Sequence, residues 1–427
     1  MLLIAGGFLI LFLIIGVPVS FAIGFSGVLA LMLGSDVPIF MAVQQMIRGI
    51  NSFPMMAGPL FILAGEILSG AQLSKRILDF SRSLLSWMKG GLGMVCVLAN
   101  MIFAGISGSG AATMAAVGSL CTPELKESGY DRSFVASLIA GSGSLGPIIP
   151  PSINMIVFAS LTGFSVGKLF LGGLGPGILI GLLLMGMCNW YARRHKIDQG
   201  TGTFSLREVG KSFSKAFFAL LTPLIIIGGV ITGVFTATES GIIACLYGLV
   251  CGGFIYRTLH LKDLYKIFKR AIESSAMLMM LMGISNIYAY IFAKENVGGA
   301  IKSIMLSIST DPTVVVCIII GLMLVIGCFM ETIAAMVVIL PVIYPIVLEL
   351  GVDPLVFGVL FSIATVVGGL TPPVGLYLFI SMNIAEAPFK EAIRYTLPVV
   401  LFVLFTMILT LFVPQVVTLI PNLLMGT

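Results

Sequence analysis

The segment GSGSLGPIIPPSIN occupies residues 141–154 of this chain, and apolar residues that could enter a bilayer flank it on both sides. Proline lacks a backbone N–H and glycine loosens the backbone, so carbonyl groups in this segment lose the partners that a regular helix would give them. A membrane helix tolerates such an interruption where the freed groups line a cavity. The segment therefore predicts a membrane helix that is broken at a binding site.

A second glycine-rich segment precedes this one, and both recur in the second half of the chain. GISGSGAATMAA at residues 105–116 matches GCFMETIAAM at residues 327–336, and the segment at 141–154 matches TVVGGLTPPVG at residues 365–375. An offset of 222 residues aligns both pairs, and most of the aligned identities are Gly, Pro or Asp at predicted turns. GVPVSFAIGFSGVLALMLG and GVFTATESGIIACLYGLVCG also resemble each other further upstream in the two halves. We interpret the pattern as an internal repeat that covers nearly the whole chain.

The composition indicates an integral membrane protein. Of the 427 residues, 58% are hydrophobic and 10% are charged, whereas soluble domains carry about 25% charged residues. A membrane helix needs about 20 apolar residues, so the chain has room for about ten spans, in an all-α fold. Two further apolar stretches, at residues 91–122 and 313–349, are expected to be re-entrant hairpins. The expected spans lie near residues 2–16, 18–34, 54–70, 133–162, 170–192, 212–232, 237–256, 273–292, 354–385 and 395–421.

The basic residues predict the orientation of the chain in a bacterial inner membrane. If both termini are periplasmic, 19 of the 23 Lys and Arg residues lie on the cytoplasmic side and 4 lie outside, as the positive-inside rule expects. The loop around Gly129 is then cytoplasmic and the loop around Gly351 is external, so the two repeats are inverted. The basic run at residues 193–196 is interpreted as a topology anchor, and a nucleic-acid partner is not expected.

Three segments, at residues 73–88, 261–272 and 297–308, have apolar residues at helical spacing and are expected to lie in the membrane interface as arms around a moving part. The domain organisation follows from these arms and from the repeat. We expect scaffold and arm helices in residues 1–89, and a hairpin and broken helix of the moving part in 90–165. Scaffold spans, cytoplasmic loops and arms are expected in 166–311, the second hairpin and broken helix of the moving part in 312–387, and a C-terminal arm and span in 388–427.

Broken helices and hairpins at symmetric positions predict a site for a cation beside an anion. Freed carbonyls and Ser or Thr hydroxyls are hard oxygen ligands that suit Na⁺, and the N-termini of half-helices attract anions. A single glycine-rich or proline-rich segment is more often a packing contact or a kink. Because the pair occurs twice in inverted copies, we favour a secondary transporter with its site at the repeat interface.

Polar residues within the apolar stretches are further candidates for this site. Glu331 could cap a half-helix or balance a cation, and both roles stay open. Glu66 and Glu239 are interpreted as hydrogen-bonding groups of the scaffold. The possible substrate contacts, for each of which an interhelical hydrogen bond is equally plausible, are Thr113, Ser152, Asn154 and Asn383.

At this point the sequence resembles a known family. Residues 105–177 look like the signature region of the large membrane subunit of tripartite ATP-independent periplasmic (TRAP) transporters. METIAAMVVILPVIYPI at residues 330–346, GGLTPPVGLYLFI at 368–380 and GVFTATESGIIACLYGL at 233–249 resemble motifs of the second half of that subunit. In this last motif Ala237 replaces the proline that is usual in the family.

The resemblance implies an elevator mechanism that is driven by a Na⁺ gradient rather than by ATP, without an organic cofactor. It also implies two partners: a small four-helix membrane subunit, which is expected to be a separate chain here, and a periplasmic protein that delivers the substrate. The substrates of the family are organic acids, chiefly C4-dicarboxylates, sialic acid and other sugar or keto acids.

The resemblance also assigns residues to the sites. The expected first Na⁺ site consists of Gly105, Ser107, Ser109, Gly143, Ser144 and Gly146. The symmetric second site consists of Gly327, Glu331, Thr332, Gly368 and Thr371. The expected substrate contacts are Ser109, Thr113, Ser152, Asn154, Thr371 and Pro372.

Two other classes of function compete with this interpretation. A standalone ion or dicarboxylate symporter of the related inverted-hairpin superfamily would work without a binding protein. An intramembrane enzyme would need a catalytic dyad, and the sequence contains no HExxH motif or paired Asp motif, nor a GxSxG motif with a membrane His. An enzyme is therefore not expected.

Overall fold

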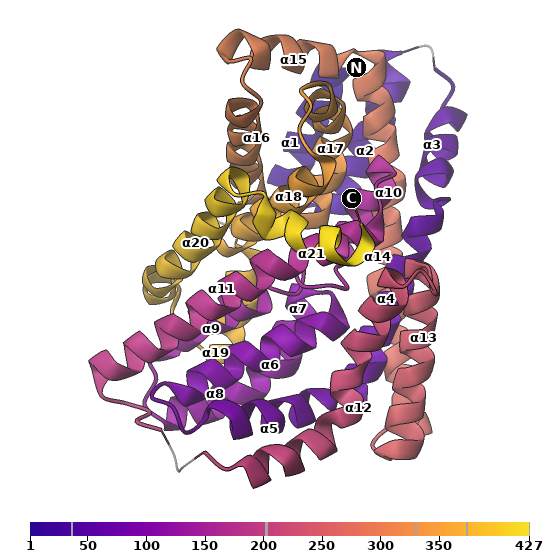
Figure 1. Ribbon diagram of the computed structural model, residues 1–427. Coiled ribbons are helices and arrows are strands. Elements are labelled where there is room, and N and C mark those ends of the chain that lie inside the picture. Colours follow the sequence, from indigo (N-terminus) through magenta and orange to yellow (C-terminus); the bar gives the residue numbers. More distant parts are fainter. Residues whose placement is uncertain (36, 201–203, 329, 331, 373–374, 427) are drawn as a thin grey trace.

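A computed structural model describes residues 1–35, 37–200, 204–328, 330, 332–372 and 375–426. Every regular element within these ranges is a helix (Figure 1). Seven helices in the described part of the chain are long and apolar enough to cross a bilayer, and they are α4, α11, α12, α13 with η2, α14, α17 and α20. The predicted all-α membrane fold is therefore confirmed.

The helices of the first half are α1 (Leu2–Ile14), α2 (Val19–Gly34), α3 (Phe40–Ile50), α4 (Phe53–Gly70), α5 (Leu73–Leu85), α6 (Gly91–Ser107), α7 (Gly110–Thr113), the π-helical turn η1 (Met114–Gly118), α8 (Ser119–Glu127), α9 (Arg132–Gly143), α10 (Ile153–Thr162) and α11 (Val166–His195). Those of the second half are α12 (Leu206–Ile231), α13 (Ala237–Val250), the π-helical turn η2 (Cys251–Ile255), α14 (Leu261–Lys294), α15 (Val297–Ile308), α16 (Pro312–Gly327), α17 (Thr332–Glu349), α18 (Pro354–Leu370), α19 (Leu376–Ala385), α20 (Phe389–Phe412) and α21 (Gln415–Met425).

The same order of elements occurs in both halves. In the first half the arm helix α5 is followed by a hairpin (α6 to α8), a broken helix (α9 and α10) and the long helix α11. In the second half the arm helix α15 is followed by a hairpin (α16 and α17), a broken helix (α18 and α19) and the long helix α20. Figure 1 shows the arms α5 and α15 at opposite ends of the molecule. In both halves a basic residue of the arm pairs with an acidic residue of the second hairpin helix, Arg82 with Glu124 and Lys302 with Glu349. This arrangement agrees with an inverted repeat.

Capping residues fix where each broken helix begins and resumes. The side chain of Asp131 accepts hydrogen bonds from the N–H groups of Ser133 (2.8 Å) and Phe134 (3.3 Å) at the start of α9. Asp353 accepts one from the N–H of Leu355 (2.8 Å) at the corresponding start of α18. An aspartate at this position satisfies N–H groups that a helix N-terminus leaves without partners.

The buried apolar side chains form two clusters. The larger one includes residues of both hairpins and both broken helices. The smaller one joins α1, α2 and α3 to α14, and it includes Ile23, Leu31 and Ile287. A buried hydrogen bond of 2.7 Å between the hydroxyls of Ser26 and Tyr288 joins α2 to α14 within it. The helices α1 to α3 thus pack on α14 in a cluster that also includes Ala334 of the second hairpin.

The structure corrects two predicted elements and adds one. Residues 261–272 do not form a separate interfacial helix, because α14 continues without a break from Leu261 to Lys294. Neither Gly nor Pro occurs before Gly283 to interrupt it. The predicted span at 395–421 is divided between α20 and α21, since Pro414 lacks the N–H that a continuous helix requires. Helix α3 was not predicted.

Candidate functional site

The tip of the first hairpin lies directly against the break between α9 and α10. The carbonyl of Gly108 accepts a hydrogen bond from the N–H of Ile153, the first residue of α10 (3.3 Å). A Cβ atom placed on Gly146 would lie 2.6 Å from the carbonyl carbon of Ser109 and 2.8 Å from the nitrogen of Gly110. Only glycine permits so close an approach of two backbones. The hairpin tip therefore contacts the broken helix through its main chain.

The second repeat contains the corresponding contact. A Cβ atom placed on Gly368, near the end of α18, would lie 2.4 Å from the Cα atom of Gly327, at the end of α16. The N–H of Thr371 bonds to the carbonyl of Gly368 (3.1 Å), and the Thr371 hydroxyl donates to the carbonyl of Val367 (2.7 Å). In both repeats a hairpin and a broken helix thus meet through glycine backbones.

A cavity of about 270 Å³ separates these elements from α4 and α14. Hairpin and broken-helix residues form one wall, and residues of α4 and α14 form the other. The lining residues are Ile62, Gly65, Glu66, Ser107, Ser109, Ala112, Ile153, Ser274, Met277, Leu278, Leu281, Ile333 and Leu376. The volume approaches that of a small-molecule pocket.

Four helix N-termini reach this cavity. Ser109 is the N-cap of the helical run α7, η1 and α8, and its hydroxyl accepts from the N–H of Ala112 (3.5 Å). Ile153 and Leu376 are the first residues of α10 and α19, and Ile333 is the second residue of α17. Each helix N-terminus carries a partial positive charge and N–H groups without helical partners. The cavity therefore favours an anionic ligand.

Four of the residues predicted for the first Na⁺ site lie close together. Gly146 lies against the Ser109 backbone, and a Cβ atom placed on Gly110 would lie 3.2 Å from the carbonyl oxygen of Gly143. The Ser107 hydroxyl bonds to the Thr113 hydroxyl (2.7 Å) beside the same turn. The structure thus brings Ser107, Ser109, Gly143 and Gly146 together.

Two residues of the predicted first site lie at its margin. Gly105 faces the carbonyl of Pro150, which would be 3.5 Å from a Cβ atom at position 105. The buried Ser144 hydroxyl donates to the carbonyl of Gly141 (2.8 Å) at the end of its own helix.

For the predicted second Na⁺ site, the structure brings Gly327 and Gly368 together and places Thr371 one turn beyond them. Thr332 is buried at the start of α17. Glu331 lies outside the described residues.

The predicted substrate residues differ in what their side chains contact. Ser109 lines the cavity, and Thr371 and Pro372 are half-buried at the break after α18. The Thr113 hydroxyl donates to the carbonyl of Ser109 (2.8 Å), and the Ser152 hydroxyl donates to the carbonyl of Pro147 (2.5 Å).

The amide of Asn154 donates to the Thr365 hydroxyl (3.4 Å) and so joins α10 to α18, across the interface of the two repeats. In this conformation Thr113 stabilises the tip of the first hairpin, and Ser152 and Asn154 stabilise the broken helices, and none of the three lines the cavity.

Two polar side chains of the cavity wall, on α4 and α14, were not assigned to the site from the sequence. Glu66 was interpreted as a scaffold group, but the structure places it on the cavity wall, and Ser274 lies opposite the hairpin on α14. An acidic residue within an apolar span was the available signal for Glu66.

The structural interpretation of Glu239 is confirmed, because its carboxylate accepts from the N–H of Thr236 (2.7 Å) and completes a capping box at the start of α13. Ala237 in place of proline therefore leaves the helix start intact.

Comparisons with known proteins agree with this architecture. The family described as "Tripartite ATP-independent periplasmic transporter, DctM component" matches residues 7–416. The chain is 36% identical over 410 residues to the isethionate TRAP transporter permease protein DctMQ of Oleidesulfovibrio alaskensis, a match that covers 96% of this chain and 65% of that protein. It is 34% identical over 415 residues to the sialic acid TRAP transporter large permease protein SiaM of Vibrio cholerae, covering 96% of each chain.

A solved structure also has a similar fold. The YdaH transporter of Alcanivorax borkumensis superimposes with a TM-score of 0.58 over 88% of this chain and 87% of its own, at 16% sequence identity.

Proposed function

Because the chain belongs to the DctM component family of tripartite ATP-independent periplasmic transporters, we propose that it is the large permease subunit of a transporter that takes up an organic acid with Na⁺. Members of this family are permeases rather than enzymes, and they are multi-pass proteins of the inner membrane. Both termini of the chain are proposed to be periplasmic, in accord with the distribution of Lys and Arg.

The observation that carries the proposal is the convergence of helix N-termini on one cavity. The starts of α10 and α19, which belong to opposite repeats, both line it, together with the start of each second hairpin helix. Positive helix ends aimed at one volume suit the carboxylate of an organic acid. Sialic acid and C4-dicarboxylates are the proposed substrate classes. The relatives named for isethionate and sialic acid transport support an anionic substrate.

Sodium is proposed to bind beside this cavity, where the hairpin tips meet the broken helices. The carbonyl oxygens of Ser109 and Gly143 and the Ser107 hydroxyl are hard ligands, and in the first repeat they lie where the hairpin tip meets the end of α9. Gly327, Gly368 and Thr371 occupy the matching place in the second repeat. A cation bound there would lower the free energy of the neighbouring carboxylate, and this would couple the two ligands.

An elevator movement is the proposed mode of transport. The hairpins and broken helices are the proposed moving unit, and α1 to α4 and α12 to α14 are the proposed scaffold, with α5 and α15 as arms. The cavity lies between the two parts, so a displacement of the moving unit relative to α4 and α14 would carry the ligand across the membrane. A periplasmic binding protein and a small four-helix membrane subunit are the proposed partners.

Uptake by reconstituted transporter tests this function. The chain is placed in liposomes with its small subunit, and uptake of radiolabelled sialic acid or succinate is measured with and without candidate binding proteins and an inward Na⁺ gradient. We expect uptake to require both additions. Uptake that needs Na⁺ but no binding protein would favour a standalone symporter, and uptake that is indifferent to Na⁺ would contradict the coupling.

A further inference from the structure

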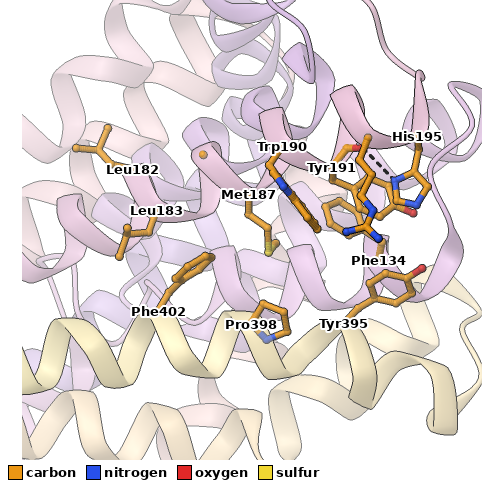
Figure 2. Close-up of a pocket in the computed structure, with 12 residues that line it drawn as sticks. Phe134, Leu182, Leu183, Met187, Trp190, Tyr191, His195, Tyr395, Pro398 and Phe402 are labelled. Atoms are coloured by element: carbon orange, nitrogen blue, oxygen red, sulfur yellow. Dashed lines mark hydrogen bonds between the residues drawn. The ribbon is translucent and has the colours of Figure 1, made fainter.

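A groove of about 650 Å³ lies away from the cavity, between α9, α11 and α20. Figure 2 shows its side chains along the facing sides of α11 and α20, with Leu182, Leu183 and Phe402 towards one end and His195 and Tyr395 towards the other. Phe134 reaches it from α9, the helix that leads to the break at Gly143.

The groove is apolar along most of its length and basic at one end. Arg194 and His195 are its basic lining residues. The Arg194 guanidinium lies 5.2 Å from the centre of the Trp190 ring, and the His195 Nδ1 atom lies 3.0 Å from the carbonyl oxygen of Tyr191. Trp190 is 57% exposed. A tryptophan beside an arginine is typical of the level of lipid headgroups.

The length of the groove matches one leaflet of a bilayer. From Leu182 to Arg194 the helix α11 rises about 18 Å, and half of the hydrocarbon core of a bilayer is about 15 Å. The basic end carries the run Arg193, Arg194 and Lys196, which the charge distribution assigns to the cytoplasmic side. A ligand in the groove would therefore have its head at the cytoplasmic surface and its apolar part at membrane depth.

We propose that this groove binds an anionic glycerophospholipid of the cytoplasmic leaflet. The headgroup phosphate pairs with Arg194 beside Trp190, and an acyl chain follows α11 past Gly186 towards Leu182 and Phe402. A groove with positive charge at one end and an apolar wall along the rest complements an amphiphile with an anionic head. A helix of another protein would find no charged side chain to pair with along the apolar part of the groove. Because Phe134 of α9 lines the groove, the lipid contacts the broken helix of the first repeat.

Gly186 allows a clean test of the acyl-chain position. A Cβ atom at this position meets no atom within 4 Å, so a side chain can start here without a clash at its first atom and extend into the groove, and the change from glycine favours the helix. Gly228 in α12 is equally open and lies outside the groove, so Gly228→Leu is the matched control for Gly186→Leu. Arg194→Gln tests the headgroup, with Arg207→Gln at the exposed start of α12 as its control.

The measurement is native mass spectrometry of the full chain with added phosphatidylglycerol or phosphatidylcholine of identical acyl composition. We expect the wild type and both controls to bind more phosphatidylglycerol than phosphatidylcholine. The ratio of the two bound lipids should be about fivefold lower in Arg194→Gln, and Gly186→Leu should lose the bound lipid. Thermal unfolding establishes that each variant is folded. Equal binding of the two lipids by the wild type, or binding that survives Gly186→Leu, would overturn the proposal. Displacement of the lipid by the small membrane subunit would also overturn it, because a protein would then be the occupant.

Discussion

Replacing Gly146 by alanine perturbs the contact on which the proposed cation site depends. The added methyl group would lie 2.6 Å from the carbonyl carbon of Ser109, and ordinary contact begins at 3.4 Å, so the hairpin tip must move by about 0.8 Å. Metal–ligand distances tolerate only about 0.2 Å. Overpacking lowers the free energy of unfolding by about 1–3 kcal/mol. We expect a loss at the upper end of this range, because both partners in the contact are backbone atoms that cannot move aside as a side chain could.

If about 1.4 kcal/mol of that cost falls on the Na⁺-bound form, the Na⁺ concentration for half-maximal uptake rises about tenfold. The assay is binding-protein-dependent uptake into proteoliposomes over a range of Na⁺ concentrations. Gly321→Ala is the matched control, since a Cβ atom at that position of α16 meets no atom within 4 Å, and its Na⁺ dependence should equal that of the wild type. A Gly146→Ala variant that inserts normally and keeps the wild-type Na⁺ dependence would refute the proposed site.

Three further predictions concern other contacts. Ser109→Leu or Thr371→Leu is expected to abolish Na⁺-dependent uptake but to leave membrane insertion intact, and unchanged uptake in reconstituted vesicles would count against those residues as ligands. The Asp198 carboxylate accepts from the Tyr130 hydroxyl (2.8 Å) and from the N–H of Leu92 (2.9 Å), so Asp198→Ala should lower the free energy of unfolding by about 2–4 kcal/mol, measured by denaturant titration, and a loss below 0.5 kcal/mol would contradict this. A hydrogen bond and charge attraction from Lys126 lower the pKa of Glu386 from its ordinary 4.5, so the stability that the pair contributes is present above that pH and is lost as the pH falls through the lowered pKa. Melting temperatures of the wild type and Glu386→Gln should therefore differ at pH 7 and converge in acid, and a difference independent of pH would exclude this pair as its source.

The backbone interruptions could be predicted from the sequence because they depend on local chemistry. Proline removes a donor wherever it stands, so Pro147, Pro150 and Pro151 indicated the break between α9 and α10. The same reasoning failed at Pro414, where a long apolar run was interpreted as one span. It also failed for α14, where a change from amphipathic to apolar character was interpreted as a boundary although the backbone has no reason to stop there.

The assignment of side chains to the cavity could not be predicted in the same way. Thr113 and Asn154 belong to the right elements, but their hydrogen bonds to the Ser109 carbonyl and the Thr365 hydroxyl depend on how the helices pack. Glu66 faces the cavity because of the rotation of α4, which an apolar sequence does not specify. A repeat pattern thus predicts where a chain is broken, whereas the packing of the two repeats determines which side chains the ligand meets.

A structure determined by electron cryomicroscopy in Na⁺ with the transported acid, compared with one in choline, tests the central proposal most directly. We expect ion density between the Ser109 turn and the Gly143 to Gly146 backbone, with the acid in the cavity at the starts of α10 and α19. Acid density at another place, or hairpin tips without bound ions in saturating Na⁺, would contradict it.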